Sequence, residues 1–386
     1  PIIISRHLNQ GFPMRTAVIG IVIGLVVGVV FGATIIAPRL TTIPASKSPE
    51  NIVKPLPKLT SAPVQKTIRR WQMASAYHSK LPLLGTMAKR LETGIWRVSD
   101  GGFEIKFHEP NALVPPRELF NAVSSGAIDA AFTTPEMWVE RLASLGLFSS
   151  VPFGPKPMEH LAWIFGGGGQ AIYNDILHKE GVHGVFCGLV SNGASGWFRR
   201  EIKTVEDLKG LKVRSSGLGA GVLEKLGVKI KTMAARDIFI AFETDKLDGA
   251  AISLPSVDAK LGVHKVAKHY YYPGWNRPAM LFDVIINLKK WNALPAPQQT
   301  QINTVCAQNI NLGLAEGEAA QFAALKAIEA KKVQIHRWPT EILAALEKAW
   351  RRQAIESSNA DSDFRRVWES LTRFRRDYSI WNDFSQ

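Results

Sequence analysis

The stretch Thr204–Arg214, which reads TVEDLKGLKVR, is the most informative part of this chain for its fold. Its last four residues, Leu211–Arg214, are predicted to form a strand that ends on an arginine. Predicted strands and helices alternate on either side of this stretch. Such alternation indicates an α/β architecture, in which helices pack against a sheet.

The predicted elements begin at about Thr67 and continue to the C-terminus. Strands are predicted over residues 68–74, 103–107, 128–132, 185–190 and 211–214, and helices over residues 83–96 and 118–125. Residues 297–386 are rich in alanine and mostly helical in pattern, with a break near Pro339. No internal repeat is found, so a solenoid or propeller is not expected.

Composition restricts the class of protein. The chain has 386 residues, 46% hydrophobic and 21% charged, which is typical of globular proteins with room for two or three domains. The formal net charge of +14 favours anionic partners. Lysine and arginine form no dense block or stripe interleaved with aromatic residues, so a nucleic-acid partner is not expected.

The two cysteines, Cys187 and Cys306, lie in apolar stretches. There is no CxxC motif and no histidine at metal-ligand spacing, which argues against a zinc site. The favoured interpretation is two small buried hydrophobic side chains. Low cysteine usage fits an oxidising compartment without proving one.

Residues 16–36 carry no charge and are long enough to cross a bilayer as a helix. The alternative is a cleaved signal peptide, but the apolar run is longer than usual and Ala33–Pro38 is a poor cleavage site. We therefore expect a cytoplasmic segment at 1–15, a transmembrane signal anchor at 16–36, a proline-rich linker at 37–66 and the main domain at 67–386.

Four glycines recur every fourth residue within the predicted anchor. Gly20, Gly24, Gly28 and Gly32 lie on one helix face and would let another backbone approach closely. This spacing predicts packing against a helix of an integral-membrane partner. The alternative is that glycine is simply common in membrane helices.

Several motifs resemble one known family. Residues 124–131 (SSGAIDAA) and Thr204–Arg214 are similar to hallmark segments of the DctP-type periplasmic binding proteins of tripartite ATP-independent periplasmic (TRAP) transporters. Residues 165–170 (FGGGGQ), 196–202 (GWFRREI), 270–275 (YYYPGW) and 374–381 (FRRDYSIW) resemble its α-keto-acid and mannitol-type branch. The resemblance runs in order from about Thr67 to the C-terminus.

This resemblance implies a type II-like periplasmic binding protein with two α/β lobes, a long interlobe helix and C-terminal helices. Ligand would bind in the cleft between the lobes, and a hinge would close over it. The family is periplasmic, which sets the orientation of the predicted anchor. The N-terminus would then be cytoplasmic and the main domain periplasmic, on a single pass through a bacterial inner membrane.

The resemblance also suggests a carboxylate site. The family arginine that matches Arg214 pairs with the substrate carboxylate, as a guanidinium fork can do with two parallel hydrogen bonds. The alternative is that Arg214 pairs with a local acid. Gln170, Trp197 and Trp275, together with Arg277, are the other candidate ligand-binding residues, although the tryptophans are as readily explained as core or cleft wall.

A family metal site is not expected in this chain. Gly193 stands where the relatives have a glutamine, Ala251 where they have a glutamate, and Arg277 where they have a second glutamate. Those oxygens hold a cation in the relatives, so the sequence predicts no metal and no other cofactor. Either Arg277 replaces the metal charge and clamps a dianion with Arg214, or the site is a relic. An internal acid such as Asp248 or Asp258, or solvent, is the expected partner of Arg277.

No motif of an enzyme is found. The run Gly166–Gly169 lacks the lysine of a phosphate-binding loop and is interpreted as close backbone packing, and neither GxSxG nor HExxH occurs. The favoured hypothesis is a non-catalytic accessory or scaffold subunit of an integral-membrane complex, such as a photosynthetic or respiratory one. The alternative is an anchored receptor that binds a small organic-acid anion through Arg214 for a TRAP permease.

Overall fold

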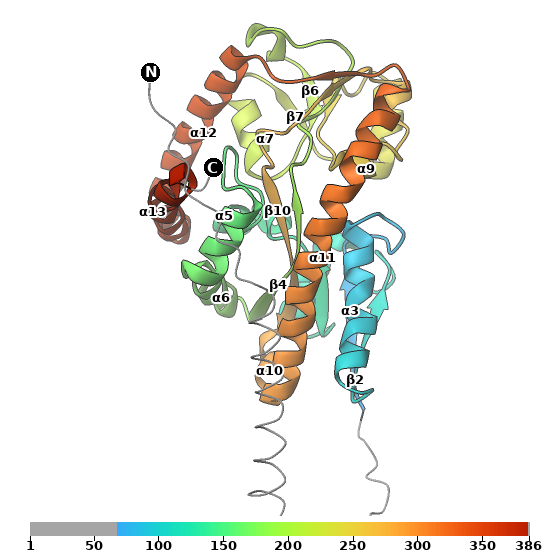
Figure 1. The fold of residues 1–386 in the computed structure, drawn as a ribbon, viewed down its shortest axis with the longest axis vertical. Helices are drawn as coiled ribbons and strands as arrows, with labels where there is room; N and C mark the ends of the chain where they lie inside the picture. The colour runs from blue at the N-terminus through green and yellow to red at the C-terminus, as the bar shows by residue number, and fades with distance from the viewer. Residues whose placement is uncertain (1–67, 385–386) are drawn as a thin grey trace, which may run out of the picture. The chain divides into compact units, whose positions relative to one another are not determined.

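The computed structural model describes residues 68–384, and its two sheets belong to two lobes (Figure 1). The sheet of the first lobe has the order β2-β1-β3-β10-β4, and that of the second has the order β11-β9-β5-β8-β6-β7. The strands of the first sheet are β1 (Arg69–Ser75), β2 (Phe103–His108), β3 (Ala130–Thr133), β4 (Val182–Ser191) and β10 (Ala279–Asn287). Those of the second are β5 (Gly196–Phe198), β6 (Lys212–Arg214), β7 (Lys229–Lys231), β8 (Gly249–Ala250), β9 (His269–Tyr271) and β11 (Gln334–His336).

Helices flank both sheets, as the alternating pattern predicted. The helices are α3 (Leu84–Val98), α4 (Leu119–Ser125), α5 (Pro157–Leu161), α6 (Gly169–Lys179), α7 (Gly217–Glu224), α8 (Ile238–Glu243), α9 (Pro255–Asp258), α10 (Leu288–Asn292), α11 (Ala296–Glu329), α12 (Thr340–Ala360) and α13 (Ser362–Phe384). Two short 3₁₀ segments, η3 (Pro135–Trp138) and η4 (Ala143–Phe148), follow β3. The predicted two-lobed α/β fold is confirmed.

Local sequence explains the individual elements. In α3, Leu84, Met87, Leu91 and Ile95 recur at three- and four-residue spacing and all are buried, so one face of the helix packs on the first sheet. All nine residues of β10 are buried, because this strand runs through the sheet between β3 and β4. A strand with neighbours on both sides and helices over its faces is expected to be continuously apolar.

The direction of the strands determines which loops meet. In the first sheet β1 and β3 are parallel, whereas β10 is antiparallel to both β3 and β4. The C-terminal ends of β1, β3 and β4 therefore lie at the same edge as the N-terminal end of β10. In the second sheet β6 and β8 are parallel, so their C-terminal ends also share an edge.

Long helices connect the lobes. Helix α11 has 34 residues, which corresponds to about 50 Å, and it packs on α3 and β4 in the first lobe and on α9 next to the second (Figure 1). Helix α12 packs on α7 of the second lobe, while α13 returns to α6 and η4 of the first. The expected long interlobe helix and C-terminal helices are thus confirmed.

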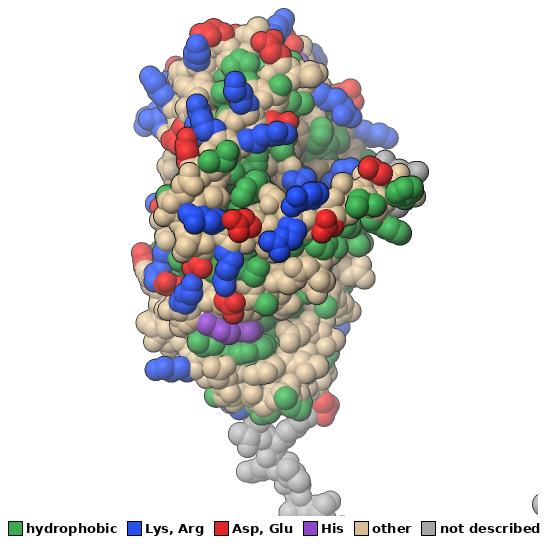
Figure 2. Space-filling model, turned by 90° about the vertical axis from the view of Figure 1, so that its left-hand side faces the viewer, with side chains coloured by type: hydrophobic (Ala, Val, Ile, Leu, Met, Phe, Trp, Pro, Cys, Tyr) green, Lys and Arg blue, Asp and Glu red, His purple; other side chains and the backbone are tan. Residues whose placement is uncertain are grey.

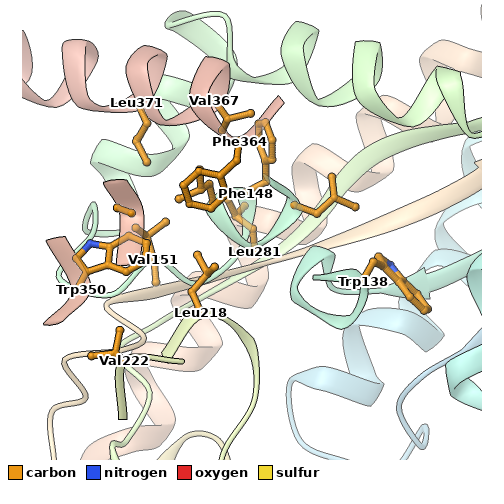
Figure 3. Close-up of a cluster of buried hydrophobic side chains, with 14 of the residues drawn as sticks. Trp138, Phe148, Val151, Leu218, Val222, Leu281, Trp350, Phe364, Val367 and Leu371 are labelled. Atoms are coloured by element: carbon orange, nitrogen blue, oxygen red, sulfur yellow. The ribbon is translucent and has the colours of Figure 1, made fainter. Parts of the chain in front are cut away.

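A continuous apolar contact joins the two lobes. Leu218 and Val222 of α7 belong to the same buried cluster as Phe148 and Val151 of the first lobe (Figure 3). The approach is close, because a Cβ atom added to Gly146 would lie 2.7 Å from Cγ of Leu218. This contact packs the start of α7 against the first lobe. It also places the loops at the C-terminal edge of one sheet next to those of the other.

The interpretation of the cysteines as two separate hydrophobic side chains is wrong. Cys187 of β4 and Cys306 of α11 form a disulfide across 119 positions of sequence. The pairing arises because α11 lies along β4, which places the two apolar stretches in contact. A protein disulfide is typical of an oxidising compartment.

The predictions for the glycine run at 166–169 and for the membrane anchor can be compared with the structure in part. The expected close packing at residues 166–169 holds for Gly167 and Gly169 only, where an added Cβ atom would lie 2.7 Å from the ring of Phe374 and 3.1 Å from Trp163, whereas Gly166 and Gly168 have no atom within 4 Å of such a Cβ atom. Within residues 68–384, no helix is long and apolar enough to span a membrane. The predicted anchor at 16–36 and its glycine face lie outside the described residues and stay predictions.

The basic charge is dispersed rather than gathered. Figure 2 shows lysine and arginine side chains scattered among acidic and neutral ones over one face. Many are paired locally, as Arg351 is with Glu347 and Arg366 with Asp175. Exposed pairs of this kind contribute little to stability, typically about 0–1 kcal/mol.

Candidate functional site

Loops from both lobes converge next to the edges described above. Tyr77 follows β1, Glu136 lies in η3 after β3, and Arg277 precedes β10. From the second lobe, Arg214 ends β6 and Ser216 precedes α7. We call these five residues the interlobe cluster. In open α/β sheets, ligands typically bind beyond the C-terminal ends of strands, which makes this cluster the candidate site.

Arg277 is held inside the cluster by three partners. Its Nη2 atom lies 3.0 Å from Oε1 of Glu136 and donates to Oγ of Ser216 at 3.1 Å, and Nη1 donates to the main-chain oxygen of Ile252 at 3.0 Å. The side chains of Arg277 and Glu136 are only 5% and 11% exposed. Arg277 therefore faces neither solvent nor Asp248 or Asp258, and its partner is an acid that we did not predict.

The absence of a side chain at Gly193 makes room for Arg277. A Cβ atom built on Gly193 would lie 3.1 Å from Cβ and 3.4 Å from Cδ of Arg277, so the arginine stem occupies the space of a residue 193 side chain. The main-chain N–H of Gly193 also donates to the oxygen of Arg277 at 2.9 Å. A glutamine at 193 and an extended arginine at 277 would compete for the same volume.

Glu136 lies beside the start of α7. A Cβ atom on Gly217 would lie 3.4 Å from Oε2 of Glu136, and the φ angle of Gly217 is +64°, a conformation that favours glycine. The carboxylate thus lies near the N-terminal end of a helix, where the helix dipole stabilises negative charge. Glu136 comes from the first lobe and Ser216 from the second, so Arg277 links both lobes.

Arg214 has a different environment from Arg277. It is half-buried, and it donates to main-chain oxygens only: Nη1 to Ala251 at 2.6 Å and Nε to Met233 at 3.5 Å. It makes no ion pair with any described residue. Burial, followed by repulsion from Arg277, lowers the pKa of Arg214 to about 10. The guanidinium remains charged at neutral pH and lacks the carboxylate partner that such a charge favours.

Tyr77 places a phenol beside these charges. Its ring packs edge-on against Phe282 and Phe132, with centroids 5.6 and 6.3 Å apart. Burial raises the pKa of Tyr77 far above its ordinary value, and the negative charge of Glu136 adds to this effect. Tyr77 is therefore a neutral phenol and a hydrogen-bond donor at physiological pH.

Three buried polar atoms next to the cluster have no hydrogen-bond partner within the described part of the chain. They are Oγ of Ser215, Oγ of Ser253 and Oδ1 of Asn276. Ser215 adjoins Arg214, and Asn276 adjoins Arg277. Buried polar atoms are nearly always paired in native proteins, so a concentration of unpaired ones indicates that a ligand or water completes the site.

The other predicted site residues, Trp197, Trp275 and Gln170, lie among side chains and elements outside the interlobe cluster. Trp197 is fully buried, lies 3.3 Å through Nε1 from Oδ2 of Asp258, and packs against Tyr270. Trp275 is buried and stacks on Phe153 at 5.6 Å. Both side chains are buried in hydrophobic clusters, and their assignment as ligand-binding residues stays a prediction. Gln170 is the second residue of α6, which packs on β4 and α13, and it is not brought together with the arginines.

Sequence reasoning did not identify Glu136, Tyr77 or Ser216. The signal that could have located Glu136 and Tyr77 is their position directly after predicted strands, where site residues of α/β proteins concentrate. Their relation to Arg277 is not visible in the sequence, because 141 positions separate it from Glu136.

Asp283 offers a pH test of the core behind Tyr77. It accepts hydrogen bonds from Thr133 and Tyr173, and burial raises its pKa to about 6. A raised pKa contributes stability that is fully present below the unfolded-state value near 4 and is lost as pH rises through 6. For Asp283→Asn, we expect the free energy of unfolding relative to wild type to shift by about 3 kcal/mol in favour of the variant from pH 3.5 to 7.5.

Chemical denaturation at these two pH values measures that shift. Thr133→Val is the comparison variant, because it keeps the titrating group and removes a hydrogen bond that lowers the pKa of Asp283, so its loss of stability with rising pH should be at least as large as that of wild type. A constant difference between Asp283→Asn and wild type across the pH range would contradict the prediction.

Two α/β lobes with a charged cluster between them are typical of periplasmic solute-binding proteins. The chain belongs to the DctP family, bacterial extracellular solute-binding protein family 7, whose sequence profile matches residues 74–358. It is 32% identical over 316 residues to a monocarboxylate 2-oxoacid-binding periplasmic protein of Nostoc, covering 81% of this chain and 86% of that one. These relatives are solute-binding receptors and not enzymes.

Solved structures give the same result. A TRAP solute-binding protein from Bordetella bronchiseptica, described with calcium and picolinate, is 31% identical with a TM-score of 0.79, covering 81% of this chain and 94% of that one. One from Pseudoalteromonas atlantica, with bound sodium and pyruvate, is 27% identical with a TM-score of 0.79, covering 82% and 97%. The main domain is thus a periplasmic solute-binding domain.

The metal ions named for those structures do not fit the residues of this chain. At the three positions compared above with the family's metal ligands, Arg277 is a buried guanidinium, and Gly193 and Ala251 offer no side-chain oxygen. Among residues 68–384, no group of three or more histidine, cysteine, aspartate or glutamate side chains could hold a metal. No step of binding is therefore assigned to a metal.

Proposed function

We propose that this protein is a receptor that binds a small organic-acid anion through Arg214 and delivers it to a TRAP-type membrane permease. The observation that carries the proposal is the state of Arg214, a half-buried guanidinium whose hydrogen bonds within residues 68–384 go only to main-chain oxygens. Its lowered pKa reflects burial and the nearby Arg277 charge. A ligand carboxylate would supply the missing negative charge and accept from the fork.

The neighbouring groups support the same function. Tyr77 can donate a hydrogen bond, and Ser215, Ser253 and Asn276 have buried polar atoms available for a ligand or for ordered water. The names of the Nostoc relative and of the pyruvate-bound structure support a 2-oxo acid as the chemical class. A 2-oxo acid carries one carboxylate and an adjacent carbonyl that accepts hydrogen bonds.

This proposal replaces the favoured hypothesis from the sequence. The accessory-subunit hypothesis depended partly on the loss of the metal site, which suggested a relic. In the structure, Arg277 is held by an ion pair with Glu136 and by hydrogen bonds to Ser216 and Ile252, which favours a maintained site over a relic. The relatives also favour a receptor over a scaffold subunit.

Isothermal titration of the purified chain tests the proposal. We expect saturable binding of at least one of pyruvate, 2-oxobutyrate and a branched 2-oxo acid, whereas pyruvamide, which lacks the carboxylate, should not bind. The reason is that Arg214 requires a negative charge. Absence of binding by every acid in the panel, with no ligand-dependent rise in melting temperature, would contradict the receptor function.

Binding is also expected to be independent of divalent and monovalent metal ions. Dialysis against a chelator, and exchange of sodium for a bulky organic cation, should leave the dissociation constant unchanged within about twofold, because Gly193 and Ala251 offer a cation no side-chain oxygen and the nearby guanidinium groups would repel it. A metal-dependent member of the family serves as the matched positive control. A tenfold or greater loss of affinity on chelation would show that a cation participates.

A further inference from the structure

We propose that Glu136 restricts the interlobe cluster to ligands with a single negative charge, by neutralising Arg277 from within. The proposal rests on the receptor function of Arg214 and adds to it a residue that determines specificity. It differs from the two-arginine clamp expected from the sequence, in which Arg214 and Arg277 would together bind a dianion.

The charge count supports this assignment. The charged side chains of the cluster are two arginines and one glutamate, which gives +2 − 1 = +1. Two further acids lie nearby, Asp258 and Asp283, and neither hydrogen-bonds a guanidinium. Any ionised fraction of these acids lowers the positive potential further. The cluster therefore offers at most one uncompensated positive charge.

Both terminal nitrogens of Arg277 already make hydrogen bonds. Nη1 donates to Ile252, and Nη2 donates to Glu136 and Ser216, so a second ligand carboxylate that used the Nη2 donors would have to displace one of these partners. The guanidinium is buried among them, with 5% of the side chain exposed. By contrast, Arg214 has a half-buried fork without an acidic partner in the described structure.

Glu136 also acts by direct repulsion. Its carboxylate is nearly buried, and Oε2 faces Gly217 at the start of α7, the position at which a helix N-terminus would otherwise attract an anion. A second carboxylate placed there would meet a like charge in a poorly solvated environment. Such juxtapositions typically reduce affinity by about 100-fold.

The experiment compares two isosteric ligands that differ by one charge, malonate and its monoamide malonamate, with pyruvate as reference. Dissociation constants are measured by titration calorimetry for wild type and Glu136→Gln. Wild type is expected to prefer malonamate to malonate by about 100-fold, and Glu136→Gln should reduce this ratio at least tenfold. The glutamine side chain of the variant keeps the shape of Glu136 and can still accept a hydrogen bond from Arg277, but it removes the negative charge.

A double variant is the matched control. In Glu136→Gln/Arg277→Met both charges are absent and the net charge returns to +1, so the preference for malonamate should return. If Glu136→Gln does not fold, the effect of Glu136 is measured by comparing Arg277→Met with the double variant. These two differ only at residue 136, and the double variant should bind malonate more tightly than Arg277→Met does, by a factor at least tenfold larger than for malonamate.

The outcomes separate the two proposals. If wild type binds neither these three acids nor any 2-oxo acid of the binding panel, the receptor function itself is overturned. If wild type binds pyruvate or malonamate but the malonamate-to-malonate ratio is the same in Glu136→Gln, the receptor function stands and Glu136 does not determine charge specificity. A shift in the ratio that the double variant reverses supports the assignment.

Discussion

Arg214→Ala is expected to weaken binding of a 2-oxo acid by about 100-fold or more. Removing one partner of a desolvated charge pair typically costs 2–5 kcal/mol, because the ligand carboxylate would then be held without its counter-charge. The effect should be large because Glu136 already neutralises Arg277, the other arginine of the cluster. Titration calorimetry with pyruvate measures the change.

Two controls make the result specific. Arg214→Lys keeps the charge but not the planar fork, so we expect an intermediate loss of about tenfold or more. Arg352→Ala removes an exposed arginine of α12 and should leave affinity unchanged. An Arg214→Ala variant that folds and binds within threefold of wild type would eliminate Arg214 as the carboxylate partner.

Removal of the disulfide should have the largest effect on stability. For the double variant Cys187→Ala/Cys306→Ala, we expect the free energy of unfolding to fall by about 2–5 kcal/mol. The bond closes a loop of 119 positions, and releasing a loop that long increases the entropy of the unfolded chain considerably. Both sulfurs also lie in the core of the first lobe, where the substitution leaves unfilled volume.

Reducing agent provides the control for this prediction. Treatment of wild type with a reductant should lower the denaturation midpoint towards that of the double variant, whereas the same reductant should not affect the double variant. Equal midpoints for oxidised wild type and the double variant would show that the bond contributes nothing to stability.

The site was predictable only in part. Arg214 was identified because it ends a predicted strand within a motif, and the motif is local. The surroundings of Arg277 depend on loops that are far apart in sequence, and the expected partners, solvent or an internal acid such as Asp248 or Asp258, differ from the Glu136 that the structure shows. Glu136 is adjacent only because β3 and β10 are neighbours in the sheet.

The sequence by itself determined the class of fold, the order of the elements and the position of Arg214. The α/β alternation follows from hydrophobic periodicity, which acts over a few residues, whereas the two-lobed class and the role of Arg214 follow from motifs that resemble the DctP family. Tertiary structure alone decided that Cys187 pairs with Cys306 and that Glu136 neutralises Arg277. Both contacts join residues more than 100 positions apart, so they exist only after the strands have paired and α11 has packed across them.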